Sequence, residues 1–343
     1  MDDVHFWSNL SALAALGGVV AYALLAGADF GGGVWDLLAA GPRRKEQRLA
    51  VQKAMGPVWE ANHVWLIFVL VVLFTCFPRG YAVLAIALFV PFHLALIGIM
   101  LRGASFVFRS YQSRQKDAAA ETSAWGIVFG VASIISPVLL GIAFGVVTEG
   151  GIRVEQGDVK LLNSTPWLSP YCLANGLLAL SACAYLGAVY LTNETEGELR
   201  EDFRRRAIFA GTATAIVAGI VVLLAWMEAR WFFTRLLSLR TLPVVLAGLV
   251  CFAGSAWSVF TRRYSLSRAF AAGEVGLLIL GWGVAQYPYL VYPDLPLDSV
   301  AAPVATLRFV VLSVPVGGIF IFPSLWILLR VFKSHQPAGY QQS

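Results

Sequence analysis

Long apolar runs alternate with short polar breaks along the whole chain. Nine of these runs approach the roughly 20 residues that an α-helix needs to cross a membrane at about 1.5 Å per residue. They cover residues 6–27, 57–77, 81–101, 124–147, 169–192, 207–227, 242–260, 269–289 and 307–331. Because a helix satisfies its backbone hydrogen bonds internally, it is the expected structure for an apolar run in a bilayer. The pattern therefore predicts nine transmembrane helices.

The breaks between the runs are too short to hold a soluble domain. We therefore predict one integral membrane domain over residues 1–343, all-α and polytopic, with two four-helix bundles and one peripheral helix. Three segments are expected at the inner surface, followed by a C-terminal tail: 28–56, 102–123, 193–206 and 332–343. The first of them could continue as an interfacial helix, because Val34, Trp35, Leu37 and Leu38 form an apolar patch.

Composition supports the membrane assignment, and charge gives an orientation. The chain is 58% hydrophobic and 13% charged, whereas a soluble domain carries about 25% charged residues. If the N-terminus is outside, 18 of the 25 Lys and Arg residues lie on the inner side of the nine-helix topology and 7 on the outer side. Cytoplasmic loops are rich in Lys and Arg, so we expect the N-terminus outside and the C-terminus in the cytoplasm.

Polar residues open the second apolar run. Glu60, Asn62 and His63 stand between Trp59 and Trp65, within the first two turns of the predicted helix. An ionisable group inside a membrane helix is costly, so the default interpretation is that it faces the protein interior and has a function. The two tryptophans are expected to pack in the core or at the membrane interface.

Other ionisable residues fall at the same depth. The predicted topology brings Asp29, Glu60 and Glu274 to the inner half of the membrane, with Arg102 as a candidate counter-charge. Such an acidic set is typical of an entry route for protons or cations. The alternative is that each carboxylate caps a helix or pairs with an arginine at the interface. This alternative is favoured for Glu274 and least favoured for Glu60.

The sequence gives little support for a metal or cofactor site within this chain. The Glu-x-x-His spacing of Glu60 and His63 occurs once, whereas di-iron bundles use it twice. His63 and His93 could together hold a haem or copper, but structural hydrogen bonding is the favoured interpretation. The four cysteines lie in apolar runs without a CxxC pair and are expected to be small core residues. The residues alone thus allow a transporter or a partner subunit of a larger assembly.

Three segments resemble subunit II of cytochrome bd-type quinol oxidases. Residues 26–33, which include Asp29, Gly31 and Gly33, are similar to the family's Asp-Gly-Phe-Asp-x-Gly-x-Gly. Residues 57–66 are similar to Pro-x-Trp-Asp-Gly-Asn-x-x-Trp-Leu and form the most specific segment. A weaker third similarity joins Arg102-Gly103, Phe106 and Phe108-Arg109 with Ala285-Gln286-Tyr287-Pro288. Order, spacing and length agree over nearly the whole chain.

The resemblance implies a role as the partner of a haem-bearing subunit I in the cell membrane of a bacterium or archaeon. Haem b and haem d (or haem b only), quinol oxidation and oxygen reduction would belong to subunit I, so no catalytic residue and no metal ligand is expected in this chain. The chain would stabilise subunit I and help to supply cytoplasmic protons through Glu60 and Asp29, with Glu274 and His63 as further candidates. Trp59, Asn62, Trp65, Arg102, Gly31 and Gly33 would form the structural motif. The resemblance also leaves room for a small accessory subunit and for a structural quinone or lipid.

Two departures from the family pattern matter for this role. Ala26 and Glu60 stand where the family has aspartates, which leaves one relay group fewer. The alternative function is an independent proton- or cation-coupled transporter that uses the same acidic set. We rank it lower, because such carriers often show internal repeats around a midplane site and no repeat is visible here.

Overall fold

The computed structural model describes residues 2–55, 59–115 and 124–334. Within these ranges, only the backbone is described for a few residues: 2, 55, 59–61, 110–115, 322, 325–326 and 328–334. The backbone of Glu60 is therefore described and its side chain is not.

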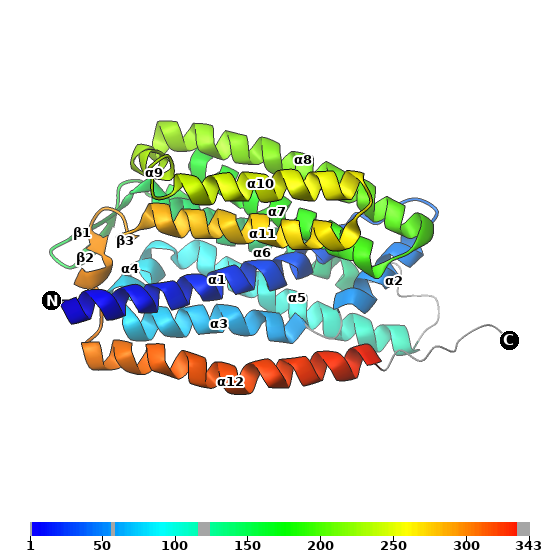
Figure 1. Ribbon diagram of the computed structural model, residues 1–343, viewed down its shortest axis with the longest axis horizontal. Coiled ribbons are helices and arrows are strands. Elements are labelled where there is room, and N and C mark those ends of the chain that lie inside the picture. Colours follow the sequence, from blue (N-terminus) through cyan, green and yellow to red (C-terminus); the bar gives the residue numbers. More distant parts are fainter. Residues whose placement is uncertain (1, 56–58, 116–123, 335–343) are drawn as a thin grey trace.

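Helices account for nearly all of the described chain (Figure 1). In order they are α1 (Asp2–Leu37), α2 (Arg44–Met55), α3 (Trp59–Cys76), α4 (Pro78–Ala87), α5 (Phe89–Gln115), α6 (Ala124–Glu149), α7 (Pro170–Glu194), α8 (Gly197–Glu228), α9 (Arg230–Leu236), α10 (Leu242–Phe260), α11 (Tyr264–Gln286) and α12 (Val304–Ser334). Two antiparallel hairpins, β1 (Ile152–Glu155) with β2 (Asp158–Leu161) and β3 (Tyr289–Val291) with β4 (Leu295–Pro296), and the short turns η2 (Pro166–Leu168) and η3 (Leu297–Ser299) complete the fold.

The predicted set of membrane spans agrees with these helices. Within the described residues, eight helices are long and apolar enough to cross a membrane, and Asn62–Cys76 in α3 is a shorter apolar helix. Several boundaries differ from the prediction. The first helix was expected to end at residue 27 but continues to Leu37, and α5 and α8 extend well into segments that were expected to be surface breaks. The interfacial helix expected after residue 28 is wrong, because those residues continue α1.

The predicted third span, residues 81–101, is divided between two helices. α4 ends at Ala87 and α5 begins at Phe89, so that Pro91 stands in the first turn of α5 instead of kinking a continuous helix. Proline has no backbone N–H and is well tolerated in a first helical turn. The chain remains connected across the break by hydrogen bonds from Leu88 N to Leu84 O and from Phe92 N to Leu88 O, both 2.9 Å.

The long helices lie side by side, so that the molecule has two distinct ends (Figure 1). We call one the hairpin end, because it carries the start of α1 and the β1–β2 and β3–β4 hairpins. We call the other the basic end, because it holds the α7–α8 and α10–α11 turns, with Arg200, Arg262 and Arg263. The charge count predicts that the basic end is cytoplasmic.

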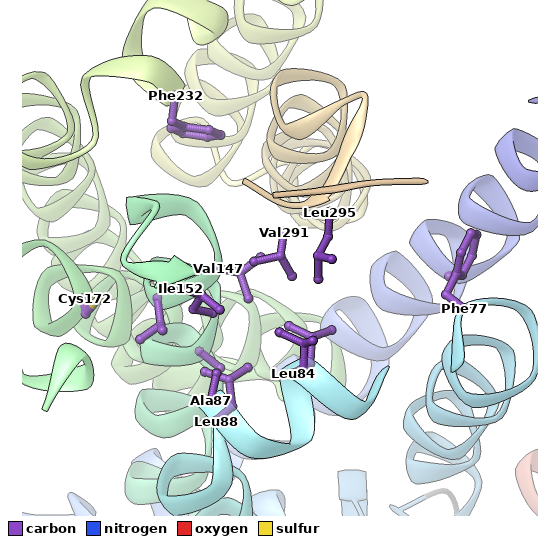
Figure 2. Close-up of a cluster of buried hydrophobic side chains, with 14 of the residues drawn as sticks. Phe77, Leu84, Ala87, Leu88, Val147, Ile152, Cys172, Phe232, Val291 and Leu295 are labelled. Carbon is purple, nitrogen blue, oxygen red and sulfur yellow. The ribbon is translucent and has the colours of Figure 1, made fainter. Parts of the chain in front are cut away.

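A core of apolar side chains closes the hairpin end. Val291 and Leu295 of the β3–β4 hairpin point toward Leu84 of α4, while Val147 and Ile152 approach from α6 and β1 (Figure 2). All five are less than 9% exposed. The hairpins therefore cover the helix ends and fix their spacing at this side.

The helix α12 is the peripheral one. It packs on α1 and α3 at one margin of the molecule. Only 11% of the residues in its most apolar stretch are buried, against 50% in the corresponding stretches of α6 and α7. It contains Pro315 and Pro323. Most exposed side chains that the structure describes on α12 are apolar, Phe309, Val316 and Phe320 among them, and they are suited to lipid or to another membrane chain.

Candidate functional site

The centre of the candidate site is a buried ion pair between α1 and α5. Arg102 Nη1 lies 2.8 Å from Asp29 Oδ2, and the two side chains are only 2% and 4% exposed. Arg102 also donates hydrogen bonds to the backbone carbonyl of Asp29 (3.1 Å) and to Ser133 Oγ on α6 (3.0 Å). The expectation that Arg102 supplies the counter-charge is therefore confirmed for Asp29.

Aromatic rings complete the surroundings of Arg102. Its guanidinium carbon lies 5.0 Å from the ring centre of Phe30 and 4.8 Å from that of Phe129. A buried charge is tolerated only when partners replace the water that it has lost. The carboxylate, Ser133 and the two rings supply those partners. The Arg102 side chain therefore connects α1, α5 and α6.

A second buried pair lies two helical turns from the first. Arg109 donates to both carboxylate oxygens of Asp36, at 2.7 and 3.0 Å, and Asp36 is 2% exposed. Each partner is seven residues beyond its counterpart in Asp29 and Arg102. Our sequence analysis missed Asp36, because it ended the first helix too early. The repeated spacing on both helices was the signal that could have revealed it.

Glycines let α1 approach its neighbours closely at this depth. A Cβ on Gly31 would meet the carbonyl oxygen of Cys183 at 1.8 Å, and one on Gly33 would meet Ser133 Oγ at 2.1 Å. Gly187 on α7 faces Gly31 in the same crossing. The Gly-Gly-Gly stretch is thus a crossing point inside a helix, where small residues let backbones come together.

The start of α3 docks beside the first ion pair. Asn62 donates to the carbonyl of Leu25 at 3.4 Å, and the His63 ring lies 5.9 Å from Tyr22 and 6.0 Å from Phe30. His63 is also within electrostatic reach of Arg102 and Asp29. The site thus includes His63, as the sequence predicted, together with Tyr22, which the sequence analysis did not single out.

Other predicted residues of this helix have different positions. Trp65 makes an edge-on contact with Phe68, with ring centres 6.2 Å apart, and both serve packing. The side chains of Trp59 and Glu60 are outside the described part of the structure, although the helix places their backbone in its first turn. Glu60 is one turn before His63 and so at the same end of α3.

Glu274 does not join this cluster. It lies on α11, is 8% exposed, and interacts electrostatically with Tyr185 of α7. Its Oε2 has no hydrogen-bond partner among the described residues. Tyr185 instead hydrogen-bonds Ser255 of α10. The structure therefore brings together Asp29, Arg102 and His63, and leaves Glu274 at a separate place.

A large apolar cavity extends from the hairpin end toward the first ion pair. Its volume is about 950 Å³, and its lining runs from Asn9 and Leu297 to Gly27 and Phe30. Two buried polar groups on this lining have no partner among the described residues: the side-chain amide of Gln286, 3% exposed, and the hydroxyl of Tyr22. Orphaned groups of this kind in an apolar cavity indicate a site for a ligand with hydrogen-bonding atoms.

The two membrane histidines, His63 and His93, lie in different surroundings. The His63 ring packs beside Tyr22 and Phe30, while His93 Nδ1 lies 2.7 Å from the carbonyl oxygen of Phe89 in its own helix. Among the described residues, no three His, Cys, Asp or Glu side chains are grouped so that they could hold a metal ion.

Comparisons with known proteins agree with this architecture. A family model described as cytochrome bd terminal oxidase subunit II matches residues 8–332. The chain is 22% identical to a putative cytochrome bd menaquinol oxidase subunit II of Bacillus subtilis, over 92% of each chain. It is 27% identical to a cytochrome bd ubiquinol oxidase subunit 2 of the same organism, over 81% of this chain and 78% of that one. The fold is similar to a chain in the structure of bd oxidase from Geobacillus thermodenitrificans, with a TM-score of 0.81, 20% identity, and coverage of 96% of this chain and 100% of that one.

Proposed function

Because the chain belongs to the cytochrome bd terminal oxidase subunit II family, we propose that it partners a haem-bearing subunit I in a membrane quinol oxidase that reduces O2 to water. The observation that carries this proposal is the family match over residues 8–332, which spans every membrane helix of the fold. Within the complex, the chain stabilises subunit I and supplies protons, and it contributes no catalytic residue.

The buried charges at the basic end support a role in proton supply. The carboxylate oxygens of Asp29 accept no hydrogen bond from the described residues, although Arg102 lies 2.8 Å away. Oδ2 is engaged by Arg102, and Oδ1 can accept a hydrogen bond from a water molecule that reaches it in the complex. We assign Glu60 as the group that takes up the proton, Asp29 with Arg102 as the fixed charges that orient water, and His63 as the next polar group along α3. Glu274, on α11, is a secondary candidate.

The direction of proton supply depends on membrane orientation. The excess of Lys and Arg at the basic end favours a cytoplasmic location for this end. The N-terminus would then be outside and the C-terminus inside the cell membrane of a bacterium or archaeon. Protons for water formation would enter from the cytoplasm, past Glu60 and Asp29, toward a haem site in subunit I. That site would hold haem b and haem d, or haem b only, and a small accessory subunit could join the complex.

The apolar cavity fits a structural quinone or a lipid. Its length along the membrane suits an isoprenoid or acyl chain, and the Gln286 amide and Tyr22 hydroxyl can donate hydrogen bonds to carbonyl oxygens. Replacing Gln286 with Leu would remove one donor without enlarging the side chain. Extraction of the purified complex should then yield less bound quinone or lipid than the wild-type complex yields.

The proposed function is tested by purifying the chain alone and together with subunit I. We expect no haem absorbance and no quinol oxidation from the chain alone, and both from the complex. A reduced-minus-oxidised spectrum gives the haem content directly. Stoichiometric haem in the isolated chain would contradict the proposal.

The transporter alternative makes the opposite prediction. A proton- or cation-coupled carrier would move its substrate when the chain alone is reconstituted in liposomes. The family match favours the oxidase subunit over this alternative. Transport by the isolated chain would reverse that preference.

A further inference from the structure

A polar pocket opens at the basic end, away from the buried ion pairs. It lies between the α7–α8 turn and the α10–α11 turn and has a volume of about 480 Å³. Its lining includes Arg200, Arg262 and Arg263 together with Asn193, Tyr264 and Ser265, and no described carboxylate lines it. A concave site with three guanidinium groups and no acid is complementary to an anion.

The helix α11 adds backbone donors to the same pocket. Its first residues, Tyr264, Ser265 and Leu266, line the pocket, and no side chain caps this helix. The first N–H groups of a helix have no partner within the helix. Together with the helix dipole they favour a bound anion, and phosphate is a typical one.

The backbone holds Arg262 and Arg263 at the pocket. Arg263 N donates to Ser258 O at 2.8 Å and Arg262 N to Val259 O at 3.4 Å, which is the hydrogen-bond pattern of a Schellman motif at the end of α10. Arg262 occupies the left-handed position of this motif, with φ of 61°, where glycine is usual. A strained side-chain-bearing residue at such a place is consistent with a binding role.

The neighbouring contacts leave the positive charge of the pocket largely uncancelled. Glu201 is already held by Arg204 through hydrogen bonds of 2.7 to 3.0 Å. Its contact with Arg262 is longer, at 3.7 Å, and Arg262 is 67% exposed there. Arg200 and Arg263 lie over aromatic rings, those of Tyr264 and Trp257 respectively, which orient the guanidinium groups without neutralising them.

From these features we infer that the pocket binds the phosphate of an anionic phospholipid. The surface beside it is apolar and exposed at Trp257, Phe260 and Leu266, so acyl chains can lie along α10 and α11 while the head group occupies the pocket. Basic pockets between transmembrane helices at the membrane surface are suited to anionic lipid head groups. A soluble phosphate could use the guanidinium groups but not the apolar surface, and for this reason the lipid is the assigned ligand.

The experiment is native mass spectrometry of the purified complex titrated with phosphatidylglycerol or phosphatidylcholine. We expect saturable binding of phosphatidylglycerol at one site and much weaker binding of phosphatidylcholine. The double variant Arg262→Gln with Arg263→Gln should weaken phosphatidylglycerol binding about fivefold for each arginine removed, or about 25-fold in total. Arg262→Lys with Arg263→Lys keeps the charge and should retain most of the binding.

A matched control separates this site from general surface charge. Arg44→Gln with Arg205→Gln removes the same charge from exposed positions at the same end and should leave lipid binding unchanged. A melting curve of each variant establishes that it is folded. Unchanged phosphatidylglycerol binding by the Arg262 and Arg263 glutamine variant would overturn the proposal. So would binding of inorganic phosphate as tight as that of phosphatidylglycerol, because the apolar surface beside the pocket would then contribute nothing to the affinity.

Discussion

Two regions of the membrane domain bury carboxylates, and they treat them differently. In α1, Asp29 and Asp36 each face an arginine of α5, at 2.8 Å and at 2.7 Å. In α11, Glu274 is almost as buried but has no arginine or lysine in contact, and one of its oxygens has no hydrogen-bond partner among the described residues. The first region therefore holds its carboxylates in ion pairs, and the second holds a carboxylate with no oppositely charged partner among the described residues.

Substitutions in the two regions should have different consequences for the fold. Removing one partner of a buried ion pair leaves the other as an uncompensated charge, so its replacement destabilises the fold. Removing an acid without a partner leaves no such charge. When a substitution at Asp29 or Asp36 lowers the activity of the complex, a loss of folding must therefore be excluded first. When a substitution at Glu274 lowers the activity, the loss reports directly on the role of that carboxylate in the reaction.

The largest expected effect is at Arg102. Arg102→Gln leaves Asp29 buried without its counter-charge and should lower the free energy of unfolding by about 3–5 kcal/mol. The melting temperature and the yield of the purified complex measure this change. The double variant Asp29→Asn with Arg102→Gln should recover part of the loss, because no unpaired charge remains. If the two substitutions were additive, the coupling between these side chains would be contradicted.

The second prediction tests the helix crossing that holds the first region together. Gly31→Ala places a Cβ within 1.8 Å of the Cys183 carbonyl oxygen, so α1 and α7 must separate. We expect a loss of about 1–3 kcal/mol in stability. Gly17→Ala is the matched control, because its Cβ would meet nothing within 4 Å. Equal melting temperatures for the two variants would argue against a tight crossing at Gly31.

A smaller effect is expected in the second region. Glu274→Gln keeps the size of the side chain and leaves no buried partner charge, so the stability should change by less than about 1 kcal/mol. Asp29→Asn is the comparison, because it strands Arg102 and should destabilise the complex much more. Thermal melting of the two variants side by side measures the contrast. A large destabilisation by Glu274→Gln would show that this acid has an essential partner.

The smallest effect belongs to an exposed pair at the hairpin end, which serves as a reference for the buried ones. His5 Nδ1 lies 2.7 Å from Asp298 Oδ2, and the two side chains are 56% and 46% exposed. Burial alone would raise the pKa of Asp298, but hydrogen bonds from Ser8 and His5 outweigh it and hold this pKa below its usual value. The pair should contribute less than about 1 kcal/mol, because solvent screens exposed charges.

The sign of the pH dependence follows from that lowered pKa. A carboxyl group whose pKa is lower in the folded state stabilises the fold above its unfolded pKa, and this contribution disappears as the pH falls through the folded pKa. Asp298→Asn should therefore lower the melting temperature slightly at neutral pH and not at strongly acidic pH. A difference that stays constant over this pH range would exclude ionisation of Asp298 as its cause.

The apolar runs were sufficient to predict the helical membrane fold and roughly its number of spans, of which the described residues contain eight candidates and the shorter apolar helix Asn62–Cys76, because membrane length and backbone hydrogen bonding leave few alternatives. They could not fix the helix ends. The first helix continues through Ala28, Asp29 and the glycines to Leu37, since Asp36 and Trp35 find buried partners on α5 and α7. Such partners come from residues far apart in sequence, and a local pattern does not reveal them.

The candidate site was predicted in part for the same reason. Asp29, Arg102 and His63 were identified because they lie within an apolar run or directly after the end of one. Glu274 was grouped with them because only its depth could be inferred from the sequence, whereas in the structure it lies on α11 and interacts with Tyr185 of α7. Gln286 was quoted only as part of a motif, and its role on the cavity lining depends on the packing of α11 against helices that no sequence spacing defines.

The most direct test of the account is the oxygen consumption of the assembled complex carrying Glu60→Gln or Glu274→Gln. Both variants remove one carboxylate and keep the side-chain size. If protons enter past Glu60 and Asp29, Glu60→Gln should slow quinol-driven oxygen consumption by about tenfold or more, with the haem content unchanged. Glu274→Gln should leave the rate close to that of the wild type. Equal rates for the two variants, or a greater loss with Glu274→Gln, would contradict the account.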